Sequence, residues 1–532
     1  MTNRRDFLRL SGALAGVTLL PGLVEQAMAQ DVKKGGHLVV SLVPEPPALV
    51  LQGTHPSHVI ILNVSDGLVS YGEKGELIPQ IASSWEQSDD GKQVTIHVRE
   101  GVKWHDGTPL TAKDVKFSIE VAQKTNTISG PTLRSISSVE ATDDNMVVLN
   151  FSTPSQAFWS VIDGAKTQII PEHLYKDGDP LTNPYNIKPV GNGPFRFKEW
   201  VRGSHLTVER NPDYWDQGKP YLDEITFRFL PDAGARAIAL QTGEAHYAPL
   251  LAIPLVEAKR IEASADSPLS IERSGWDSIA PIYFLNLNLE REFFKDVRVR
   301  KAIAHALDRK LLANNGFFGY AKPATGPIAS YQERFYTPDT EQYDFNVEKA
   351  EQLLDEAGLS KDANGVRLSF DNMPIPYGED YTRTAQLIQQ LLKRVGIQVE
   401  LKSYDVATYF RKLNVERDYD TASLYYSTFS DPQIGAAFRR YWSKAKETPA
   451  GGNSSAYVSA EADRLIEAAL VEPNVEKRHQ LIVELQKLAQ TELPSISLLE
   501  LEFFRVRSKR LEGINNGPFG AFASLASASF KD

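Results

Sequence analysis

The stretch Ile81–Val115, IASSWEQSDDGKQVTIHVREGVKWHDGTPLTAKDV, carries the most decisive structural pattern in the chain. Val94, Ile96 and Val98 alternate with polar residues, which is the two-residue period of a half-buried strand. Asp89-Asp90-Gly91, just before them, has the turn chemistry that joins two antiparallel strands. We therefore expect a β-hairpin here, within a first half of the chain that is mainly β.

Outward from this hairpin the sequence is first β-like and then mixed. Short β-like runs extend from His37 to Phe229 and are broken by prolines and by Asp and Asn turns. Helical stripes of apolar residues follow Asp296, a good N-cap residue, and Asn346, whose stripe stops at Gly358. A third helical stripe of apolar residues ends at a glycine, and a segment in which apolar and polar residues alternate, as in a strand, follows it. Helix, glycine and strand repeated in this order predict an α/β lobe in the second half.

The composition is that of a large globular protein. At about 150 residues per domain, 532 residues predict three or four domains. The chain has 42% apolar and 24% charged residues, an ordinary globular balance, and its net charge of -10 gives nucleic-acid binding no electrostatic support. The absence of cysteine excludes disulfides, thiolate-bound zinc, iron–sulfur clusters, a cysteine nucleophile and a lipid-modified N-terminal cysteine.

Residues 1–29 are interpreted as an export signal. A basic segment, Asn3–Arg9, precedes an apolar stretch at 10–24 that is too short and too rich in glycine for a stable membrane span. Ala27-Met28-Ala29 has the small-x-small form that signal peptidase accepts, and the Arg4-Arg5 pair resembles a twin-arginine signal. An ordinary secretory signal with two arginines is the alternative. Either signal predicts cleavage near Ala29 and an unanchored periplasmic protein.

Motifs of the common enzyme classes are missing. The sequence contains no G-x-S-x-G, H-E-x-x-H or G-x-x-x-x-G-K-[ST] motif, and Gly191–Arg196 fails the dinucleotide fingerprint at its third glycine. Trp104–Gly107, WHDG, offers a His/Asp dyad, but a β-turn above a buried tryptophan explains it better. His55 and His58 are the only closely spaced histidines, and they occupy a Pro/Ser loop without a third ligand. We therefore predict a protein that is not an enzyme and has no metal site and no cofactor.

Several separated blocks together resemble one family. Residues 81–115 match its signature almost position for position, and GNGPF at 191–195 followed by RNPDYW at 210–215 is similar to its second block. FKDVRVRKAI at 294–303 resembles a third block, and the match runs from about residue 36 to about residue 500. The chain thus resembles the extracytoplasmic solute-binding proteins of ABC importers, family 5, the peptide, nickel and opine class that is also called dipeptide-binding-like.

This resemblance implies an α/β fold of two lobes, a type II, cluster C-like periplasmic-binding-protein clamp with an extra β-rich domain inserted in the first lobe. The implied division is 30–75, 190–285 and 500–532 for the first lobe, 76–189 for the inserted domain, and 286–499 for the second lobe. The lobes are expected to close on a small-molecule ligand by hinge motion. The implied partner is the membrane permease of an ABC importer with its ATPase, and the protein is expected to be a monomer.

The resemblance also points to Leu424–Pro432, LYYSTFSDP, as a ligand-binding stretch. In peptide-binding members, an aspartate shortly before an acidic-Pro pair receives the ligand's α-ammonium group. Aligning Asp431-Pro432 on that pair places Thr428 at the position of the aspartate. A hydroxyl cannot neutralise an ammonium ion, whose attraction to a carboxylate is about 4 kcal/mol at about 4 Å and an effective dielectric near 20. Peptides with a free N-terminus are therefore disfavoured, unless another acid such as Glu45 takes that role.

Aromatic residues near this stretch complete the predicted site. Three of them lie in the stretch itself and two lie near the expected hinge crossing. Aromatic faces with hydroxyl groups suit sugars, opines and amides, and ordinary core packing is the alternative. The candidate ligand-binding residues are Glu45, Trp276, Tyr283, Tyr425, Tyr426, Thr428 and Phe429.

Three charged residues in or after this stretch, Asp431, Arg439 and Arg440, have other interpretations. Asp431 is expected to cap a helix that starts at Pro432 rather than to touch a ligand. Arg439 and Arg440 are either partners of a ligand carboxylate or phosphate, or residues on a helix surface.

The predicted function is capture of a small polar organic solute, such as a modified peptide, an opine or an oligosaccharide-like molecule, and its delivery to the permease. An ordinary di- or oligopeptide-binding protein of the same family is the alternative. An exported hydrolase or cofactor enzyme on this scaffold is the alternative from another class.

Overall fold

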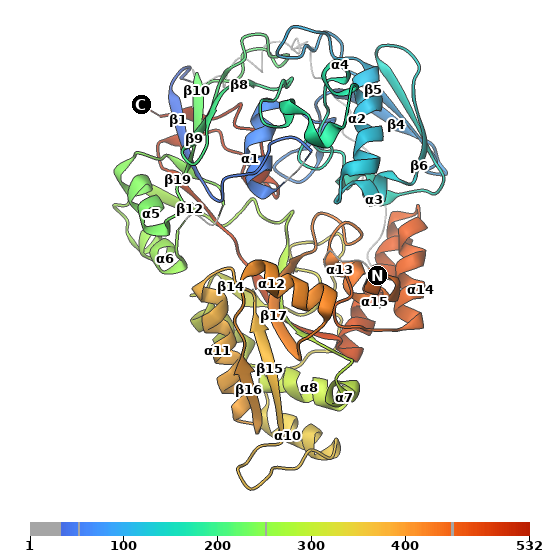
Figure 1. Cartoon of the computed structure of the whole chain (residues 1–532), viewed down its shortest axis with the longest axis vertical. Coiled ribbons are helices and arrows are strands. Elements are labelled where there is room, and N and C mark those ends of the chain that lie inside the picture. The colour runs from blue at the N-terminus through green and yellow to red at the C-terminus, as the bar shows by residue number, and fades with distance from the viewer. Residues whose placement is uncertain (1–32, 52–53, 251–252, 448–451, 532) are drawn as a thin grey trace, which may run out of the picture.

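The computed structural model describes residues 33–51, 54–250, 253–447 and 452–531. The predicted signal segment and its cleavage site lie outside the described residues. Two bodies are stacked along the long axis of the molecule, and the upper body contains two sheets side by side (Figure 1). In the described ranges, no helix combines the length and apolarity that crossing a membrane requires.

The first lobe is built on a seven-stranded sheet in the order β12-β19-β11-β1-β10-β9-β8. Its central strand, β1 (His37–Leu42), pairs in parallel with β10 (Glu224–Phe229) and with β11 (Tyr247–Ala248). The other strands are β8 (Phe195–Val201), β9 (His205–Arg210), β12 (Leu269–Glu272) and β19 (Arg505–Ser508). The helices of this part are α1 (His55–Val64), α5 (Ala233–Thr242) and α6 (Leu255–Ala263). The β-like runs predicted for the first half are thus confirmed.

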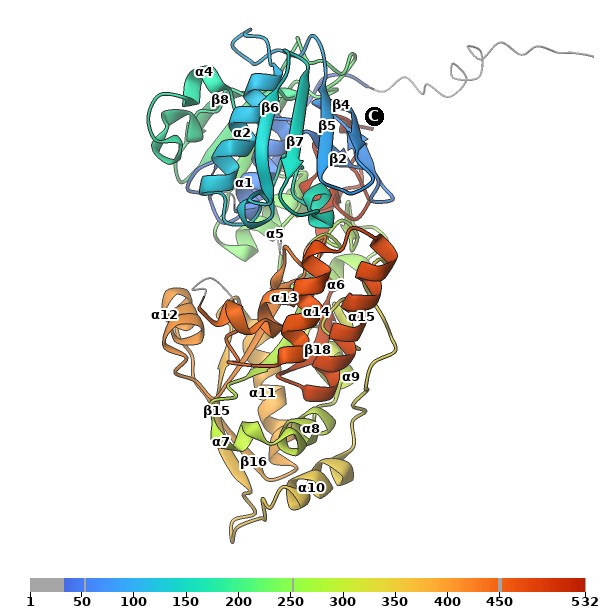
Figure 2. The same cartoon turned by 90° about the vertical axis from the view of Figure 1, so that its right-hand side faces the viewer.

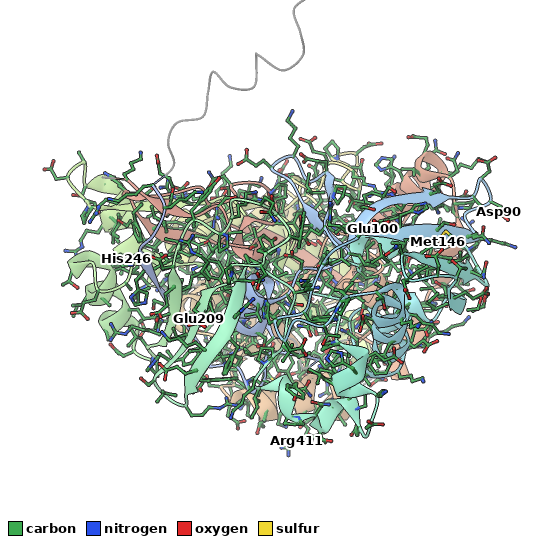
Figure 3. The ribbon with its side chains drawn as sticks, turned by 90° about the horizontal axis from the view of Figure 1, so that it is seen from above. Asp90, Glu100, Met146, Glu209, His246 and Arg411 are labelled. Atoms are coloured by element: carbon green, nitrogen blue, oxygen red, sulfur yellow. The ribbon has the colours of Figure 1, made fainter. Side chains whose placement is uncertain are left out.

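The inserted domain has a four-stranded antiparallel sheet in the order β4-β5-β7-β6. β5 (Gln93–Val98) pairs with β4 (Ala82–Gln87) across the turn at 89–91, where Gly91 has a φ of +67°, so the predicted hairpin is confirmed. This domain also contains β6 (Ile136–Ala141), β7 (Met146–Phe151), α2 (Ala112–Thr125), α3 (Gly130–Leu133) and α4 (Glu172–Tyr175), and a small separate hairpin, β2 (Val69–Tyr71) with β3 (Leu77–Pro79), precedes β4. Seen from above, His246 of the first lobe and Met146 of this domain lie at opposite ends of the upper body (Figure 3).

The second lobe contains a six-stranded sheet in the order β14-β18-β13-β17-β15-β16, which is flanked by helices (Figure 2). Its strands are β13 (Pro281–Leu287), β14 (Ala321–Pro323), β15 (Leu368–Pro374), β16 (Ile397–Leu401), β17 (Thr421–Ser427) and β18 (Ser495–Leu501). Its longer helices are α8 (Val297–Ala306), α10 (Val347–Glu356), α11 (Glu379–Lys393), α14 (Ala460–Val471) and α15 (Val475–Glu492), and the short ones include α12 (Val406–Arg411) and α13 (Ala436–Tyr441).

The local signals that define these helices behave as the sequence predicts. The side chain of Asp296 accepts a hydrogen bond from the backbone N–H of Arg298 at 2.8 Å, and that of Asn346 accepts one from Lys349 at 2.8 Å. Gly358, after the C-terminus of α10, has a φ of +80°, in the left-handed region that a side chain would disfavour. The predicted N-caps and this glycine stop are confirmed.

The chain crosses between the lobes at 273–280 and again at 502–504. Trp276 and Phe503, one from each crossing segment, pack edge to face with ring centroids 5.2 Å apart. The predicted divisions at 285/286 and 499/500 fall within β13 and β18, which pair with each other in the second sheet. The domain limits stay predictions. The two-lobed α/β fold class with an extra β-rich domain is confirmed.

Candidate functional site

A cavity of about 520 Å³ lies between the first lobe, the inserted domain and the second lobe. This volume is within the range of about 300–1,000 Å³ that small-molecule sites occupy. Its walls are formed by the start of α1, by segments within 62–80, 163–166, 214–219 and 513–527, by Ser278 and Ile279 of a crossing segment, and by Phe429 of the second lobe. The first lobe and the inserted domain therefore supply most of the surface that a ligand would meet.

A buried carboxylate, Asp66, lies in one wall of this cavity. Its Oδ2 atom accepts hydrogen bonds from the Tyr214 hydroxyl at 2.8 Å and from the Trp215 indole at 2.7 Å. Its Oδ1 atom accepts one from the Gln80 amide at 3.1 Å. The guanidinium of Arg99 lies 4.2 Å from the centroid of the Trp215 ring. Burial raises the pKa of Asp66 to about 6, although the two hydrogen bonds to Oδ2 oppose this effect.

An ion pair between the buried Asp163 and the partly buried Lys166 forms a second polar part of the wall. The ammonium group of Lys166 donates to Asp163 Oδ2, and the backbone N–H of Ala165 donates to Asp163 Oδ1 at 2.9 Å. The same ammonium lies 5.7 Å from the ring centroids of Tyr71 and Phe519, which stack on each other at 3.7 Å. The carboxylate, the ammonium and the two aromatic faces thus hold one another in place beside the cavity.

Two histidines line the cavity from the first turn of α1. The sequence predicts a loop for His55 and His58, and this prediction is wrong, because Thr54 caps a helix that starts at His55. Both rings lie near Phe522, at 5.4 and 6.3 Å between centroids. Burial lowers the pKa of His55. Burial, together with the neighbouring His55 and the charge of Lys166, lowers the pKa of His58 to about 3, so both imidazoles are neutral near pH 7. Among the described residues, no group of three or more metal-binding side chains includes them.

All of the predicted ligand-binding residues lie in the described part of the chain, and of these only Phe429 lines this cavity. Its φ of +52° is left-handed, and its backbone N–H donates to the carbonyl of Ile279 at 3.2 Å. Its ring packs against the hydrophobic cores of both the inserted domain and the two lobes. Ile434, a few residues later, is itself buried in the core of the inserted domain. The segment 428–435 of the second lobe therefore reaches across to the other body.

Thr428 and Glu45 are held by groups of the protein. The Thr428 hydroxyl is buried and donates to the Gln332 side chain at 2.6 Å. Glu45 accepts from the Trp200 indole at 2.9 Å and from the backbone N–H of Gly203 at 2.9 Å, within the first lobe. Neither residue lines the cavity, and their contact with a ligand stays a prediction.

The other predicted aromatic residues lie in a continuous packing arrangement near the crossing segments. Tyr425 of β17 stacks on Tyr381 at 5.8 Å and meets Phe503 edge to face at 5.6 Å. The rings of Trp276, Tyr283 and Tyr426 pack against Phe522, Phe317 and Phe284, respectively. This is the core packing given above as the alternative, and none of the four lines the cavity. Their ligand contact also stays a prediction.

The charged residues near this stretch have structural partners. Asp431 is fully buried and pairs with Arg478 through two contacts of 2.8 Å. It also accepts from the backbone N–H of Gln433, but residues 432–434 form a turn and α13 begins only at Ala436, so the predicted helix start is wrong. The guanidinium of Arg440 is buried over the Phe284 ring at 4.1 Å, and neither Arg439 nor Arg440 lines the cavity.

The WHDG segment forms the predicted turn. The backbone N–H of Gly107 donates to the carbonyl of Trp104 at 2.8 Å, and Trp104 is buried. His105 contacts the carbonyl of Gly193 at 3.0 Å, whereas Asp106 pairs with His173 at 2.8 Å. The two side chains have separate partners, so they do not form a dyad.

Sequence reasoning missed most of the cavity. Asp66 and Lys166 are lone charged residues in unremarkable contexts, and the 513–527 wall comes from the far end of the chain. Trp215 enters the sequence analysis only as part of the second family block at 210–215, although it both lines the cavity and donates to Asp66. The one feature of the sequence that drew attention to residues of this cavity was the close spacing of His55 and His58, which are the only closely spaced histidines in the chain.

A family model of the bacterial extracellular solute-binding proteins, family 5, middle part, matches residues 76–448, more than half of the chain. The chain belongs to this family. The predicted assignment of this solute-binding protein to family 5, which serves ABC importers, is confirmed. A cavity that lies between two lobes is the expected place for its ligand.

Relatives of this solute-binding protein carry ligands of several kinds. The oligopeptide-binding protein AppA of Bacillus subtilis is 28% identical over 479 residues, covering 86% of this chain and 84% of AppA. The structure of AppA with a nonapeptide has a TM-score of 0.77 and 25% identity, covering 94% of this chain and 100% of that chain. The structure of AgaA from A. tumefaciens R10 with agropinic acid has a TM-score of 0.76 and 28% identity, covering 93% and 99%.

Proposed function

We propose that this protein is the periplasmic receptor of an ABC importer, and that it captures a small polar organic solute by closure of its two lobes and delivers it to the permease. The observation that carries this proposal is the cavity of about 520 Å³, to which both lobes and the inserted domain contribute. Contacts made by both lobes exist only when the lobes are together, so a ligand that makes them shifts the population towards the closed form. Export by the twin-arginine route, cleavage near Ala29 and a monomeric state belong to the same proposal.

The chemistry of the cavity supports a solute with both polar and apolar faces. Phe429, Phe519 and Phe522 offer apolar surfaces, while Asp66 and the Asp163–Lys166 pair offer acceptors and donors. A modified peptide, an opine or an oligosaccharide-like molecule presents such a mixture. AgaA, with agropinic acid, is a relative that favours the opine class.

An ordinary di- or oligopeptide ligand is the second candidate. The observation that favours it is the similarity to AppA, whose structure contains a nonapeptide. Against it, the position predicted to hold the ammonium-binding aspartate is Thr428, whose hydroxyl is already bonded to Gln332.

The proposed function predicts that the purified protein carries its solute. The mature chain is produced in cells grown in complex medium, purified without denaturant and then heat-denatured, and the released small molecules are identified by mass spectrometry. Adding the recovered solute back to protein that has been unfolded, washed and refolded should raise its melting temperature, because the solute binds only the folded state.

The same samples separate binding from catalysis. After prolonged incubation the solute should be recovered unchanged, whereas a hydrolase or cofactor enzyme on this scaffold would consume it. Recovery of ordinary short peptides would favour the second candidate. The absence of any bound solute, together with no thermal shift for peptides, opines or oligosaccharides, would contradict the proposed function.

A further inference from the structure

One residue of the second lobe belongs to the hydrophobic core of the inserted domain. Ile434 is 2% exposed, and among the described residues every other fully buried member of that core lies between Leu68 and Ile169. Phe429, from the same segment, packs against this core and also lines the cavity, whereas Ile434 does not line it. Ile434 therefore joins the two bodies outside the surface that a solute in this cavity would meet.

The second lobe holds Ile434 in place through its own contacts. Residues 432–434 form a turn, in which the backbone N–H of Ile434 donates to the carbonyl of Asp431 at 3.0 Å. The guanidinium of Arg439 donates to the carbonyl of Ile434 at 3.1 Å, and the ion pair with Arg478 fixes Asp431 at the start of the turn. The backbone of Ile434 thus belongs to the second lobe, while its side chain is buried in the inserted domain.

A weaker contact supports the same junction. The hydrogen bond from the Gln156 amide to the carbonyl of Pro473 is exposed, so water competes for both groups and its net contribution is small. Burial of the Ile434 side chain removes apolar surface from water, which makes it the stronger of the two contacts. Both contacts are made between protein groups alone, so neither of them requires a solute.

We infer that Ile434 is a latch, which stabilises the closed form of the protein independently of the solute and thereby sets the affinity for the solute. The closed form is the one in which Ile434 is buried in the inserted domain. This inference rests on the proposed function, in which the solute binds the closed form. A receptor that is closed for only a fraction of the time binds more weakly by that fraction. Loosening the latch should therefore weaken the binding of every solute by the same factor.

The first test measures the open and closed populations without solute. The protein is unfolded, washed and refolded, and an energy-transfer pair is attached through Lys124→Cys on α2 and Glu348→Cys on α10. The protein with Ile434 intact should show a high-efficiency, closed population. Ile434→Ala should lower the ratio of closed to open molecules about tenfold or more, because truncating a buried isoleucine commonly costs at least this factor. Ile434→Val keeps most of the buried surface and should give an intermediate ratio.

A matched control separates the latch from the stability of the inserted domain. Ile96→Ala makes the same truncation in the same core, on β5. It should lower the free energy of unfolding and leave the ratio of closed to open molecules unchanged. With the solute recovered by mass spectrometry as the probe, calorimetry should give a dissociation constant that Ile434→Ala raises and Ile96→Ala does not.

A cysteine at position 434 reports the opening of the latch directly. In Ile434→Cys the only thiol of the chain lies at this buried position, so a maleimide reaches it only when the two bodies separate. Its labelling should be much slower than that of Val458→Cys, which replaces a residue that is 72% exposed. It should be faster than that of Ile96→Cys, which requires unfolding of the inserted domain. The recovered solute at saturation should slow the labelling at position 434, because it favours the closed form.

The outcomes separate this inference from the proposed function. Labelling at position 434 that is as fast as at 458 would show that Ile434 is not held between the bodies, and labelling as slow as at 96 would show that the contact does not open. A solute-free protein without a closed population, or a closed-to-open ratio that Ile434→Ala leaves unchanged, would also overturn the latch. In each case, recovery of a bound solute that raises the melting temperature would leave the proposed function standing.

Discussion

At the scale of single residues, Asp66 shows how burial sets the state of a charged group. Its carboxyl accepts three hydrogen bonds from side chains, yet its pKa is raised to about 6 because burial disfavours the charge. Below about pH 4 the group is protonated in both the folded and the unfolded state. Between about pH 4 and about pH 6 the unfolded chain has already released this proton while the folded protein still holds it, so the contribution of Asp66 to folding stability falls over this interval and is lost above it.

This shift predicts the pH dependence of the variant Asp66→Asn. At pH 4 the variant and the wild type should have similar free energies of unfolding. At pH 7 the variant should be more stable than the wild type by up to about 3 kcal/mol, because its amide carries no charge, whereas the buried carboxyl of Asp66, whose pKa is raised to about 6, is ionised at this pH. Urea unfolding at a series of pH values measures the difference, and Asp177→Asn, an exposed residue, is the control. A constant difference between Asp66→Asn and wild type from pH 4 to pH 7 would refute this account of Asp66.

Residue roles differed in how well the sequence predicted them. The capping roles of Asp296 and Asn346 were predictable, because a cap depends on a backbone N–H two or three positions away. The placement of His58 in a cavity wall was not, because Phe522, against which its ring lies, and most of the other lining residues are far away in the sequence. Thr428 illustrates a third case, since alignment identified its position but not the hydrogen bond to Gln332.

At the scale of elements, a buried ion pair joins the segment 428–435 to α15. Asp431 and Arg478 are 0% and 3% exposed, and two contacts of 2.8 Å link them. Gly435 lets this segment fold back, because a Cβ atom there would lie 2.3 Å from the carbonyl oxygen of Thr428. The Asp431–Arg478 ion pair and the close approach of Gly435 to the Thr428 carbonyl together fix the loop from which the Phe429 ring reaches the cavity.

Breaking this pair on one side should be strongly destabilising. Arg478→Met leaves the Asp431 carboxylate buried without its partner and should lower the free energy of unfolding by about 3–5 kcal/mol. The double variant Asp431→Asn/Arg478→Met removes both charges and should recover a large part of this loss. Denaturant unfolding of the two variants measures the difference. A double variant as unstable as the single one would show that the lost charge is not the cause.

The start of α13 shows why elements near the site are harder to predict than those elsewhere. Asp431-Pro432 is a strong helix-start signal in sequence, yet α13 begins at Ala436. The ion pair with Arg478 and the packing of Ile434 into the inserted domain hold residues 432–434 in a turn. In contrast, the hairpin at 82–98 and the helices α8 and α10 follow from local periodicity and were predicted correctly.

At the scale of the whole molecule, the fold was predictable and the site was not. The signature blocks predicted the two-lobed fold through their resemblance to one family, whose model matches residues 76–448. The cavity is assembled from α1, the 163–166 segment and the 513–527 segment, which lie about 100 and about 350 positions apart along the chain. Only the three-dimensional structure brings them together, so sequence reasoning centred on the Leu424–Pro432 stretch found Phe429 alone.

Contacts between the two bodies extend beyond the crossing segments. The amide of Gln156, in the inserted domain, donates to the carbonyl of Pro473 between α14 and α15 at 2.6 Å. Figure 2 shows these two helices directly below the inserted domain. With Ile434 buried in the inserted domain, the second lobe thus touches the upper body on one side of the hinge. A hinge motion that opens the cavity has to separate these contacts.

The most direct test of the central claim is single-molecule energy transfer between the two bodies. The chain has no cysteine, so Lys124→Cys on α2 and Glu348→Cys on α10 provide two unique labelling sites on exposed residues. With the solute recovered by mass spectrometry at saturation, the account predicts a single population of higher transfer efficiency than in the solute-free protein. Identical efficiency distributions with and without the bound solute would contradict it.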